Sequence, residues 1–394
     1  MRTALLKPDN RVYDVTMTPT ALYLHIPFCA SKCAYCDFNS VVAGADLHAL
    51  YLRALTEEIA RTGSFYNERV FTTVYFGGGT PTLLGPQALC QLLTEIRRRY
   101  NLSPDAEITC EANPGTVDAE SLAIMREHGF NRLSLGVQSF DDDELKLLGR
   151  RHDAAQARRA LAEARAAGFT NLSLDLINAL PGQTPDEWED TLQEAIAFRP
   201  QHLSCYGLSV EDDTPLARLV AAGELQMPDE DLGPVIYELT HDLCSAAGYE
   251  HYEISNFALD GYRCRHNENY WRNGEYVGLG AGAVSYLNGH RMKHEPDSRR
   301  WAEAALVGMA PTLVEREALD DEQRAAETLM LALRTSEGLD LKRFGHQFDL
   351  DLSRFAVRLK ALKESGLALD LPGKLVLSPV KGFLLQSEIA QMFM

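Results

Sequence analysis

Short apolar stretches alternate with longer amphipathic ones through the first half of the chain. Stretches such as PQALCQLLTEIRRRY and DAAQARRALAEARAAG carry apolar residues at helical spacing. Between them lie six short apolar stretches that are expected to be strands: ALYLHI (21–26), TTVYFGG (72–78), AEITCEA (106–112), NRLSLGV (131–137), TNLSLDL (170–176) and QHLSCYGLSV (201–210). Strands that alternate with helices predict βαβ units and therefore an α/β fold with a parallel sheet.

The number of these units leaves two architectures open. Six units are fewer than the eight of a complete TIM barrel. A doubly wound open sheet and a partial (βα)6 barrel both fit the pattern. In either one the functional site is expected at the carboxyl ends of the strands, where the unusual polar residues of this chain gather.

The second half of the chain has a different pattern. A glycine-rich, aromatic segment follows the strands at 261–287. Helices and one hairpin are predicted around it: helices at 229–248, at 320–338 with an Asp cap and at 351–366, and a hairpin at 367–379 that turns at Pro-Gly. The chain is expected to divide into a core at 1–220, an extension at 221–312 and a small winged-helix-like α+β domain at 313–394.

Composition and charge exclude some classes of protein. The 394 residues are 45% hydrophobic and 24% charged, which is typical of a globular protein with a sizeable core. A net charge of −18 argues against a nucleic-acid binder, which needs a basic face. No apolar run approaches the roughly 18 residues of a membrane span, and residues 1–14 have no adequate apolar core for a signal peptide. The protein is therefore expected to be cytoplasmic, with its cysteines as thiols.

Three cysteines directly after the first predicted strand carry the strongest chemical signal. Cys29, Cys33 and Cys36 have the spacing Cys-x3-Cys-x2-Cys. Cysteine thiolates hold iron–sulfur clusters, and three of them leave one iron of a [4Fe–4S] cluster open. The alternative is a zinc site with His25 as the fourth ligand, although His25 lies within the strand. The remaining cysteines are scattered and are expected to be buried apolar residues: Cys90, Cys110, Cys205, Cys244 and Cys264.

This cysteine motif resembles that of the radical S-adenosylmethionine (SAM) enzymes. The resemblance implies that the open iron chelates SAM, and that an electron from a donor protein cleaves SAM to a 5′-deoxyadenosyl radical. Further motifs extend it over nearly the whole chain: LYLHIPFC, YFGGGTPT, CEANPG, LSLGVQSF, LGRRH, LDLINALPGQT and HNENYW. Together these motifs resemble the oxygen-independent coproporphyrinogen III oxidase family.

Polar and glycine residues at the predicted strand ends are candidates for the SAM site. Glycine allows a ligand to approach the backbone closely, and an arginine can bind a carboxylate as a fork. The resemblance implies contacts with SAM from Gly78, Gly79, Thr80, Glu111, Gln138, Arg150 and Asp175, with Tyr35 near the adenine, and from Tyr23, Gly207 and Val284. Without the resemblance, the glycines also fit a turn, Arg150 fits a surface charge and the two tyrosines fit core packing. Asn113, beside Glu111, suits a ribose hydroxyl.

Two departures separate this chain from the true oxidases and favour the branch of HemW-type haem chaperones. The oxidases typically carry a further cysteine where this chain has Phe38, and a longer segment before the motif than the 28 residues here. The resemblance then implies haem as cargo, delivered to membrane haemoproteins, with transient membrane association. His266 is the candidate axial ligand for haem iron, and Tyr270 and Trp271 are candidates for packing on the porphyrin.

Several alternatives remain open at this point. Without the resemblance, His266 and its aromatic neighbours are expected to be a buried plug that closes the sheet. Cys264 is a weaker candidate contact for haem. Three other functions also remain open for the protein: a coproporphyrinogen oxidase, another porphyrin-modifying radical SAM enzyme and a zinc-dependent structural protein.

Overall fold

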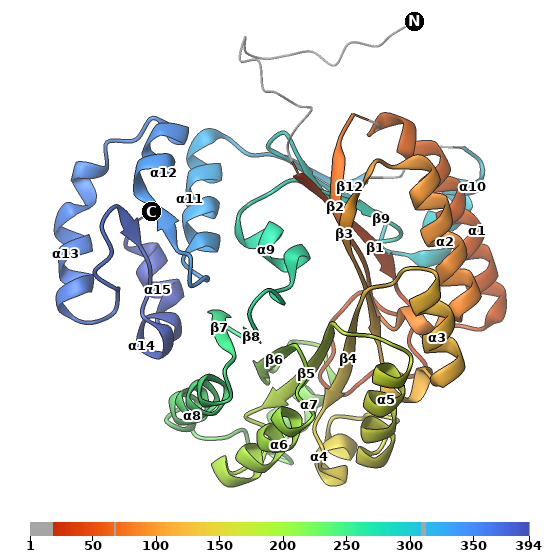
Figure 1. The fold of residues 1–394 in the computed structure, drawn as a ribbon, viewed down its shortest axis with the longest axis horizontal. Helices are drawn as coiled ribbons and strands as arrows, with labels where there is room; N and C mark the ends of the chain where they lie inside the picture. The colour runs from red at the N-terminus through yellow and green to blue at the C-terminus, as the bar shows by residue number, and fades with distance from the viewer. Residues whose placement is uncertain (1–18, 67, 309–312, 394) are drawn as a thin grey trace, which may run out of the picture.

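Six parallel strands form the centre of the molecule (Figure 1). The computed structural model describes residues 19–66, 68–308 and 313–393. The strands are β1 (Pro19–Ile26), β2 (Val70–Gly78), β3 (Leu102–Ala112), β4 (Arg132–Gln138), β5 (Leu172–Asn178) and β6 (His202–Gly207). Each pairs with the next in parallel. A doubly wound sheet would reverse its strand order at a switch point, so the consecutive order establishes the partial barrel.

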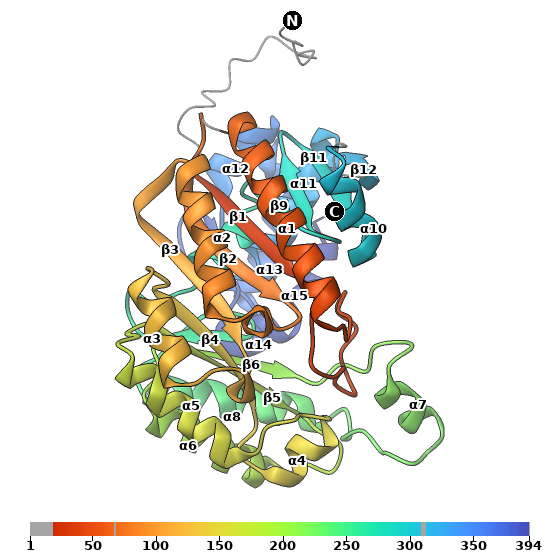
Figure 2. The same cartoon turned by 90° about the vertical axis from the view of Figure 1, so that its right-hand side faces the viewer.

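Helices cover the outer face of these strands, as Figure 2 shows. They are α1 (Ala45–Thr62), α2 (Pro86–Arg99), α3 (Ala119–Glu127), α4 (Asp142–Leu147), α5 (Ala154–Ala166) and α6 (Pro185–Ala197). The buried side of α2 shows why: Leu89, Leu93 and Ile96 recur at helical spacing and join the main core. Asp118, Asp153 and Thr184 cap α3, α5 and α6, each cap stabilising its helix by about 1 kcal/mol.

The sheet continues beyond the six predicted strands at both edges. The added strands are β7 (Glu250–Glu253), β8 (Asn256–Ala258), β9 (Tyr276–Leu279), β10 (Val284–Leu287), β11 (His290–His294) and β12 (Leu313–Ala318). Strand β8 pairs with β6, and β9 pairs in parallel with β1, which gives a sheet of twelve strands in the described part of the chain. These strands were not predicted, because each has only three to six residues and some lie in glycine-rich sequence.

The helices of the extension lie on both sides of the sheet (Figure 1). They are α7 (Pro215–Ala221), α8 (Leu232–Ala246), α9 (Arg265–Trp271) and α10 (Ser298–Leu306). Helix α10 packs against α1 on the outer side. Helix α8 confirms the helix predicted at 229–248 and packs on α6. Helix α9 lies on the concave side, between β2 and the C-terminal helices (Figure 1).

The C-terminal residues form a small α+β unit with a core of its own. Its elements are α11 (Asp321–Ala332), β13 (Leu339–Asp340), α12 (Leu341–Phe348), α13 (Ala356–Glu364), β14 (Lys374–Leu375), α14 (Pro379–Leu384) and α15 (Gln386–Gln391). The predicted helices are confirmed, and the Asp320 side chain caps α11. The predicted hairpin is minimal: a bridge joins Ala368 to Leu377, while β14 pairs with β13. Strand β12 belongs to the large sheet, so this unit begins at α11.

Arg334 is one of the residues through which the C-terminal unit contacts the core. Arg334 Nη2 lies 3.5 Å from Glu253 Oε2, and the guanidinium lies 4.5 Å from the centre of the Trp271 ring. The backbone joins the same seam, because Ile254 N donates to Arg334 O at 3.1 Å. Trp271 therefore packs towards the C-terminal unit.

A buried carboxylate fixes the turn between β9 and β10. Glu58 on α1 is 0% exposed, and its Oε2 accepts a hydrogen bond from Gly280 N at 2.8 Å. Tyr51, about two turns earlier, donates to His25 O at 2.7 Å and accepts from Ala281 N at 2.9 Å. These two side chains tie the extension to the end of β1. Burial raises the pKa of Glu58 to about 7.

This raised pKa predicts how stability depends on pH. The unfolded chain releases the Glu58 proton near its ordinary pKa of 4.5, whereas the folded protein keeps it up to about 7. The contribution of Glu58 to folding is therefore largest at low pH, and about 3 kcal/mol of unfolding free energy from this group is lost as the pH rises through this window. Denaturant titrations at several pH values from 4.5 to 8 measure this loss. Glu58→Gln should remove the share of the pH dependence that comes from Glu58, because glutamine remains neutral, and an unchanged profile would contradict the assignment.

No helix within the described ranges is long and apolar enough to cross a bilayer. The stretch in which no signal peptide was predicted, residues 1–14, lies outside the described residues.

Candidate functional site

The three motif cysteines lie on a loop that follows β1 and is held by backbone hydrogen bonds. Cys29, Cys33 and Cys36 are half-buried free thiols. Cys29 N donates to Val41 O at 3.0 Å, and Ala34 N donates to Leu148 O at 3.1 Å beyond α4. These two hydrogen bonds fix the loop at Cys29 and at Ala34. The loop lies at the carboxyl end of the parallel strands, where the site was predicted.

His25 is engaged elsewhere and does not complete a zinc site with these thiols. Its Nδ1 lies 3.0 Å from Tyr23 Oη and its Nε2 lies 2.8 Å from Asn39 O. Within the described residues, no three His, Cys, Asp or Glu side chains are grouped as ligands of one ion would be. A [4Fe–4S] cube has a different requirement, since each cysteine binds a separate iron.

The glycines after β2 lie against the cysteine loop. Gly79 N donates to Ile26 O at 2.9 Å, and a Cβ at Gly79 would lie 2.6 Å from Phe28 O and 3.0 Å from Cys29 Sγ. Gly78 has a φ of +116°, which side chains rarely adopt. Any larger residue would displace the loop, so these glycines are required for packing against the cysteines as well as for any ligand.

Two carboxylates, Glu111 in β3 and Asp175 in β5, lie on the inner side of the barrel in the strands that flank β4. Glu111 accepts hydrogen bonds from Tyr75 Oη at 2.8 Å and from Gly78 N at 3.1 Å. Burial raises the pKa of Glu111 to about 7. Asp175 accepts from Ser134 Oγ at 3.1 Å, and burial raises its pKa as well. Both are acceptors for ligand hydroxyl or amino groups.

Arg150 reaches the cysteine loop from the segment after α4. Its Nη2 donates to Gly136 O at 2.8 Å and to Asn113 Oδ1, while its Nη1 lies 3.4 Å from Cys33 Sγ. Nε of Arg150 is buried and has no partner among the described residues. Such an atom fits an acceptor like the SAM carboxylate. The contact with Cys33 was not predicted from the sequence.

The remaining candidates for the SAM site lie at different distances from the cysteines. Gln138 ends β4 with a φ of +71°, at an irregularity in its pairing with β5. Tyr35 lies on the loop and packs in a small apolar cluster with Leu147 and Leu208. Gly207 ends β6, exposed to solvent. Val284 begins β10, which is separated from β1 by β9, so it lies one strand further from the loop.

His266 is buried inside the barrel, with both ring nitrogens near hydroxyl groups. It is 1% exposed; Nδ1 lies 2.8 Å from Thr73 Oγ1 and Nε2 lies 3.0 Å from Tyr270 Oη. Its ring stacks on Tyr75 at 4.8 Å. Burial lowers the pKa of His266 to about 3, so the imidazole is neutral. This geometry matches the buried aromatic plug that the sequence left open as an alternative.

Some residues that build this site carry no signal in the sequence. Glu107 Oε1 accepts from His266 N at 3.1 Å at the start of α9. Arg132 is 2% exposed in the same interior, and its charge helps to lower the pKa of His266. A charged residue within a strand normally faces solvent, and only the curvature of the partial barrel turns Glu107 and Arg132 inward.

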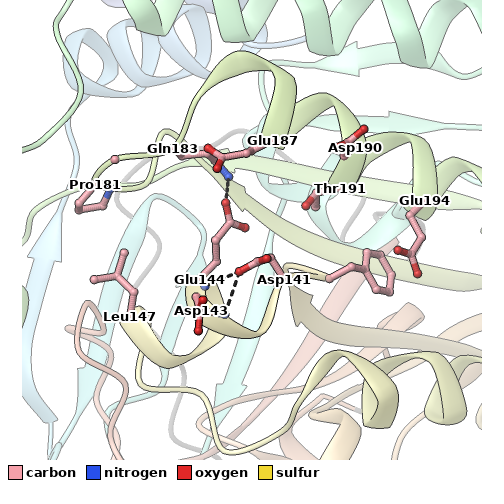
Figure 3. A pocket seen from close by; sticks show the side chains of 12 residues that line it. Asp141, Asp143, Glu144, Leu147, Pro181, Gln183, Glu187, Asp190, Thr191 and Glu194 are labelled. Atoms are coloured by element: carbon pink, nitrogen blue, oxygen red, sulfur yellow. Dashed lines mark hydrogen bonds between the residues drawn. The ribbon is translucent and has the colours of Figure 1, made fainter.

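A pocket of different character lies between α4 and α6 (Figure 3). Acidic side chains surround it, and Gln183 Nε2 donates to Glu144 Oε1 at 2.7 Å across it. Asp141 accepts from the backbone N atoms of Asp143 and Glu144 and so caps α4. Asp141 and Glu144 thus have structural roles in this pocket, as the cap of α4 and as the partner of Gln183.

Comparison with known proteins agrees with this site. Residues 23–195 match the family model of the radical SAM superfamily, and residues 319–385 match that of the HemN C-terminal domain. The solved structure of coproporphyrinogen III oxidase (HemN) from Escherichia coli, described as a radical SAM enzyme, is similar. Its TM-score is 0.81 at 26% identity, and the match covers 95% of this chain and 90% of that one. The fold and the cysteine loop are those of a radical SAM protein.

Curated relatives narrow the family. The chain is 39% identical to "Heme chaperone HemW" of Synechocystis sp., over 82% of this chain and 80% of that protein. It is 38% identical to "Heme chaperone HemW" of Bacillus subtilis, over 88% and 91%, and 43% identical to that of Escherichia coli, over 68% and 70%. The chain belongs to the HemW family within the radical SAM superfamily, as its motifs predicted.

Proposed function

We propose that this protein is a haem chaperone that holds a [4Fe–4S] cluster at Cys29, Cys33 and Cys36, binds SAM beside it and carries haem. One observation supports this most: relatives of 38–43% identity over most of the chain are named "Heme chaperone HemW". In this proposal, the cluster and SAM together supply one-electron chemistry. The protein supplies the cysteine loop, Arg150 with its unpartnered Nε and the acceptors Glu111 and Asp175.

The geometry suits SAM in two respects. Glu111 lies near the end of β3 and Asp175 lies within β5, while Arg150 follows α4 and contacts Cys33 of the cysteine loop. Gly78 and Gly79 present backbone without side chains there. The proposed set is completed by residues whose contacts with SAM are carried over from the family: Tyr23, Tyr35, Thr80, Gln138, Gly207 and Val284.

Haem binding is proposed at α9, with a local rearrangement. For Nε2 of His266 to ligate iron, its contact with the Tyr270 hydroxyl at 3.0 Å must open. A neutral imidazole is the ligating form, and the lowered pKa of His266 keeps it neutral at every physiological pH. Trp271 faces Arg334 of the C-terminal unit, so a porphyrin that packs on Trp271 would also contact that unit.

The second candidate function is coproporphyrinogen oxidation, which the similarity to HemN keeps open. Against it stands Phe38, which is 66% exposed where the oxidases typically have a cysteine. One anaerobic experiment separates the two: haem titration and coproporphyrinogen turnover on the same reconstituted protein. The chaperone should bind about one haem per chain without decarboxylating the substrate. Conversion to protoporphyrinogen with no haem binding would establish the oxidase.

Arg150→Ala is expected to weaken SAM binding by about thirtyfold, because a charged hydrogen bond contributes about 2 kcal/mol. Isothermal titration with the reconstituted protein measures this. The iron content should remain normal, since Arg150 donates to a cysteine sulfur without ligating iron. Arg151→Ala is the matched control, because Arg151 is exposed and donates to Ala30 O at 3.2 Å. Equal SAM affinity in both variants would remove Arg150 from the site.

The partners and the location follow from the same proposal. Haem would pass to membrane haemoproteins during transient contact with the membrane, and a separate protein would supply electrons to the cluster. The proposed compartment is the cytoplasm. The boundary between residues 1–220 and the extension that begins at 221 also remains a proposal, and the C-terminal unit is proposed to begin at α11 instead of 313, because β12 belongs to the large sheet.

A further inference from the structure

Asn113 lies between two groups that face the cysteine sulfurs. Its Oδ1 accepts a hydrogen bond from Arg150 Nη2, and Arg150 Nη1 lies 3.4 Å from Cys33 Sγ. Its Nδ2 donates to Thr80 Oγ1 at 2.9 Å, and Thr80 Oγ1 lies 3.8 Å from Cys29 Sγ. One amide group therefore holds both donors that face these two sulfurs.

The partners determine the orientation of this amide. A guanidinium has donors only, so the amide oxygen must face Arg150. The NH2 group then faces Thr80, whose hydroxyl oxygen accepts from it. The hydroxyl proton of Thr80 is left to point at Cys29 Sγ. The hydroxyl proton of Thr80 and a proton on Nη1 of Arg150 are thus directed towards the two sulfurs.

The backbone leaves room for the frame. Gly136 O accepts from Arg150 Nη2 at 2.8 Å, which fixes the guanidinium from a second side. A Cβ at Gly136 would lie 2.9 Å from Asn113 Oδ1 and 3.2 Å from Arg150 Nη2. A side chain at this position would push the arginine and the amide apart.

We propose that Asn113 is a positioning residue that raises the reduction potential of the cluster by holding Arg150 and Thr80 against Cys33 and Cys29. This rests on the proposed function, because it requires the cluster. Reduction adds one electron, here supplied by dithionite, and increases the negative charge on the cluster and its sulfurs. Hydrogen bonds and a nearby cation stabilise that added charge, so the reduced state becomes more favourable. Arg150 is half-buried, which limits screening by solvent.

The test is the midpoint potential of the reconstituted, full-length protein without SAM, from a dithionite titration followed by electron paramagnetic resonance. Asn113→Ala should shift the potential to more negative values, because both donors lose their support. Thr80→Val should give a smaller shift in the same direction, and Thr80→Ser should restore the original potential, because it keeps the hydroxyl. Arg151→Gln is the matched charge control and should leave the potential unchanged, since its exposed guanidinium contacts a carbonyl oxygen and no sulfur.

Each outcome decides a separate point. If the unmodified protein assembles no iron–sulfur cluster, the proposed function fails. A normal cluster with the same potential in Asn113→Ala and Thr80→Val overturns this inference alone. A lower iron content with an unchanged potential also overturns it, because the frame would then be merely structural. An equal shift in Arg151→Gln overturns it too, since net charge would then be the cause. If Asn113→Ala fails to assemble a cluster, the comparison of Thr80→Val with Thr80→Ser decides the inference.

Discussion

Anaerobic reconstitution should give about four iron and four sulfide per chain, and replacing Cys29, Cys33 or Cys36 with alanine should abolish this cluster. Each thiolate holds a different corner of the cube, so two remaining cysteines cannot retain it. The loop is fixed by hydrogen bonds from Cys29 N to Val41 O and from Ala34 N to Leu148 O. The fold should therefore survive each replacement, which circular dichroism can verify. Iron and sulfide analysis with the visible absorption spectrum measures the loss.

Buried cysteines elsewhere provide the matched controls. Cys90 is 5% exposed on α2 and Cys244 is 0% exposed on α8, and both belong to the main core. Replacing either with alanine should leave the iron and sulfide content unchanged, at a modest cost in stability. Stoichiometric zinc without sulfide in the unmodified protein would contradict the cluster, as would a normal cluster in Cys33→Ala.

Replacing His266 with leucine is expected to change the haem spectrum and to weaken haem binding, because the proposed iron ligand is lost. The same change removes contacts with Thr73 Oγ1 and Tyr270 Oη and leaves two hydroxyls unpaired. It should therefore also destabilise the fold by about 2–4 kcal/mol. The Soret band and the denaturation midpoint must both be measured, so that a loss of ligand is distinguished from a loss of fold.

Tyr270→Phe tests whether His266 ligates haem iron without changing the aromatic packing around it. It keeps the aromatic ring, which packs edge-on against Tyr276 at 4.7 Å, and removes the hydroxyl that occupies Nε2. If Nε2 ligates haem iron, this variant should bind haem at least as tightly as the unmodified protein, with the same axial-ligand spectrum. Haem binding that is unaffected by His266→Leu would exclude His266 as the iron ligand. Binding that is lost in Tyr270→Phe would show that the Tyr270 hydroxyl itself contacts haem.

Local patterns in the sequence were sufficient for the central fold, and they singled out the cysteine loop as the candidate site. Six apolar stretches predicted β1 to β6, because a strand covered on both faces is continuously apolar whatever its neighbours are. The spacing of Cys29, Cys33 and Cys36 indicated the cluster, since a short loop is all that three ligands need. The capped helix at Asp320 was predicted for the same local reason.

Tertiary structure alone decided whether the sheet is open or closed, and which side chains meet inside it. Strand order joins segments far apart in the chain, such as β1 and β9, and the short strands that do so have no distinctive pattern. The contact of Arg150 with Cys33 spans 117 residues, and Asn113 lies on a third segment. Local sequence determines what each residue can donate or accept. Which partner it meets depends on the curvature of the sheet, because that curvature brings the strand ends together around one loop.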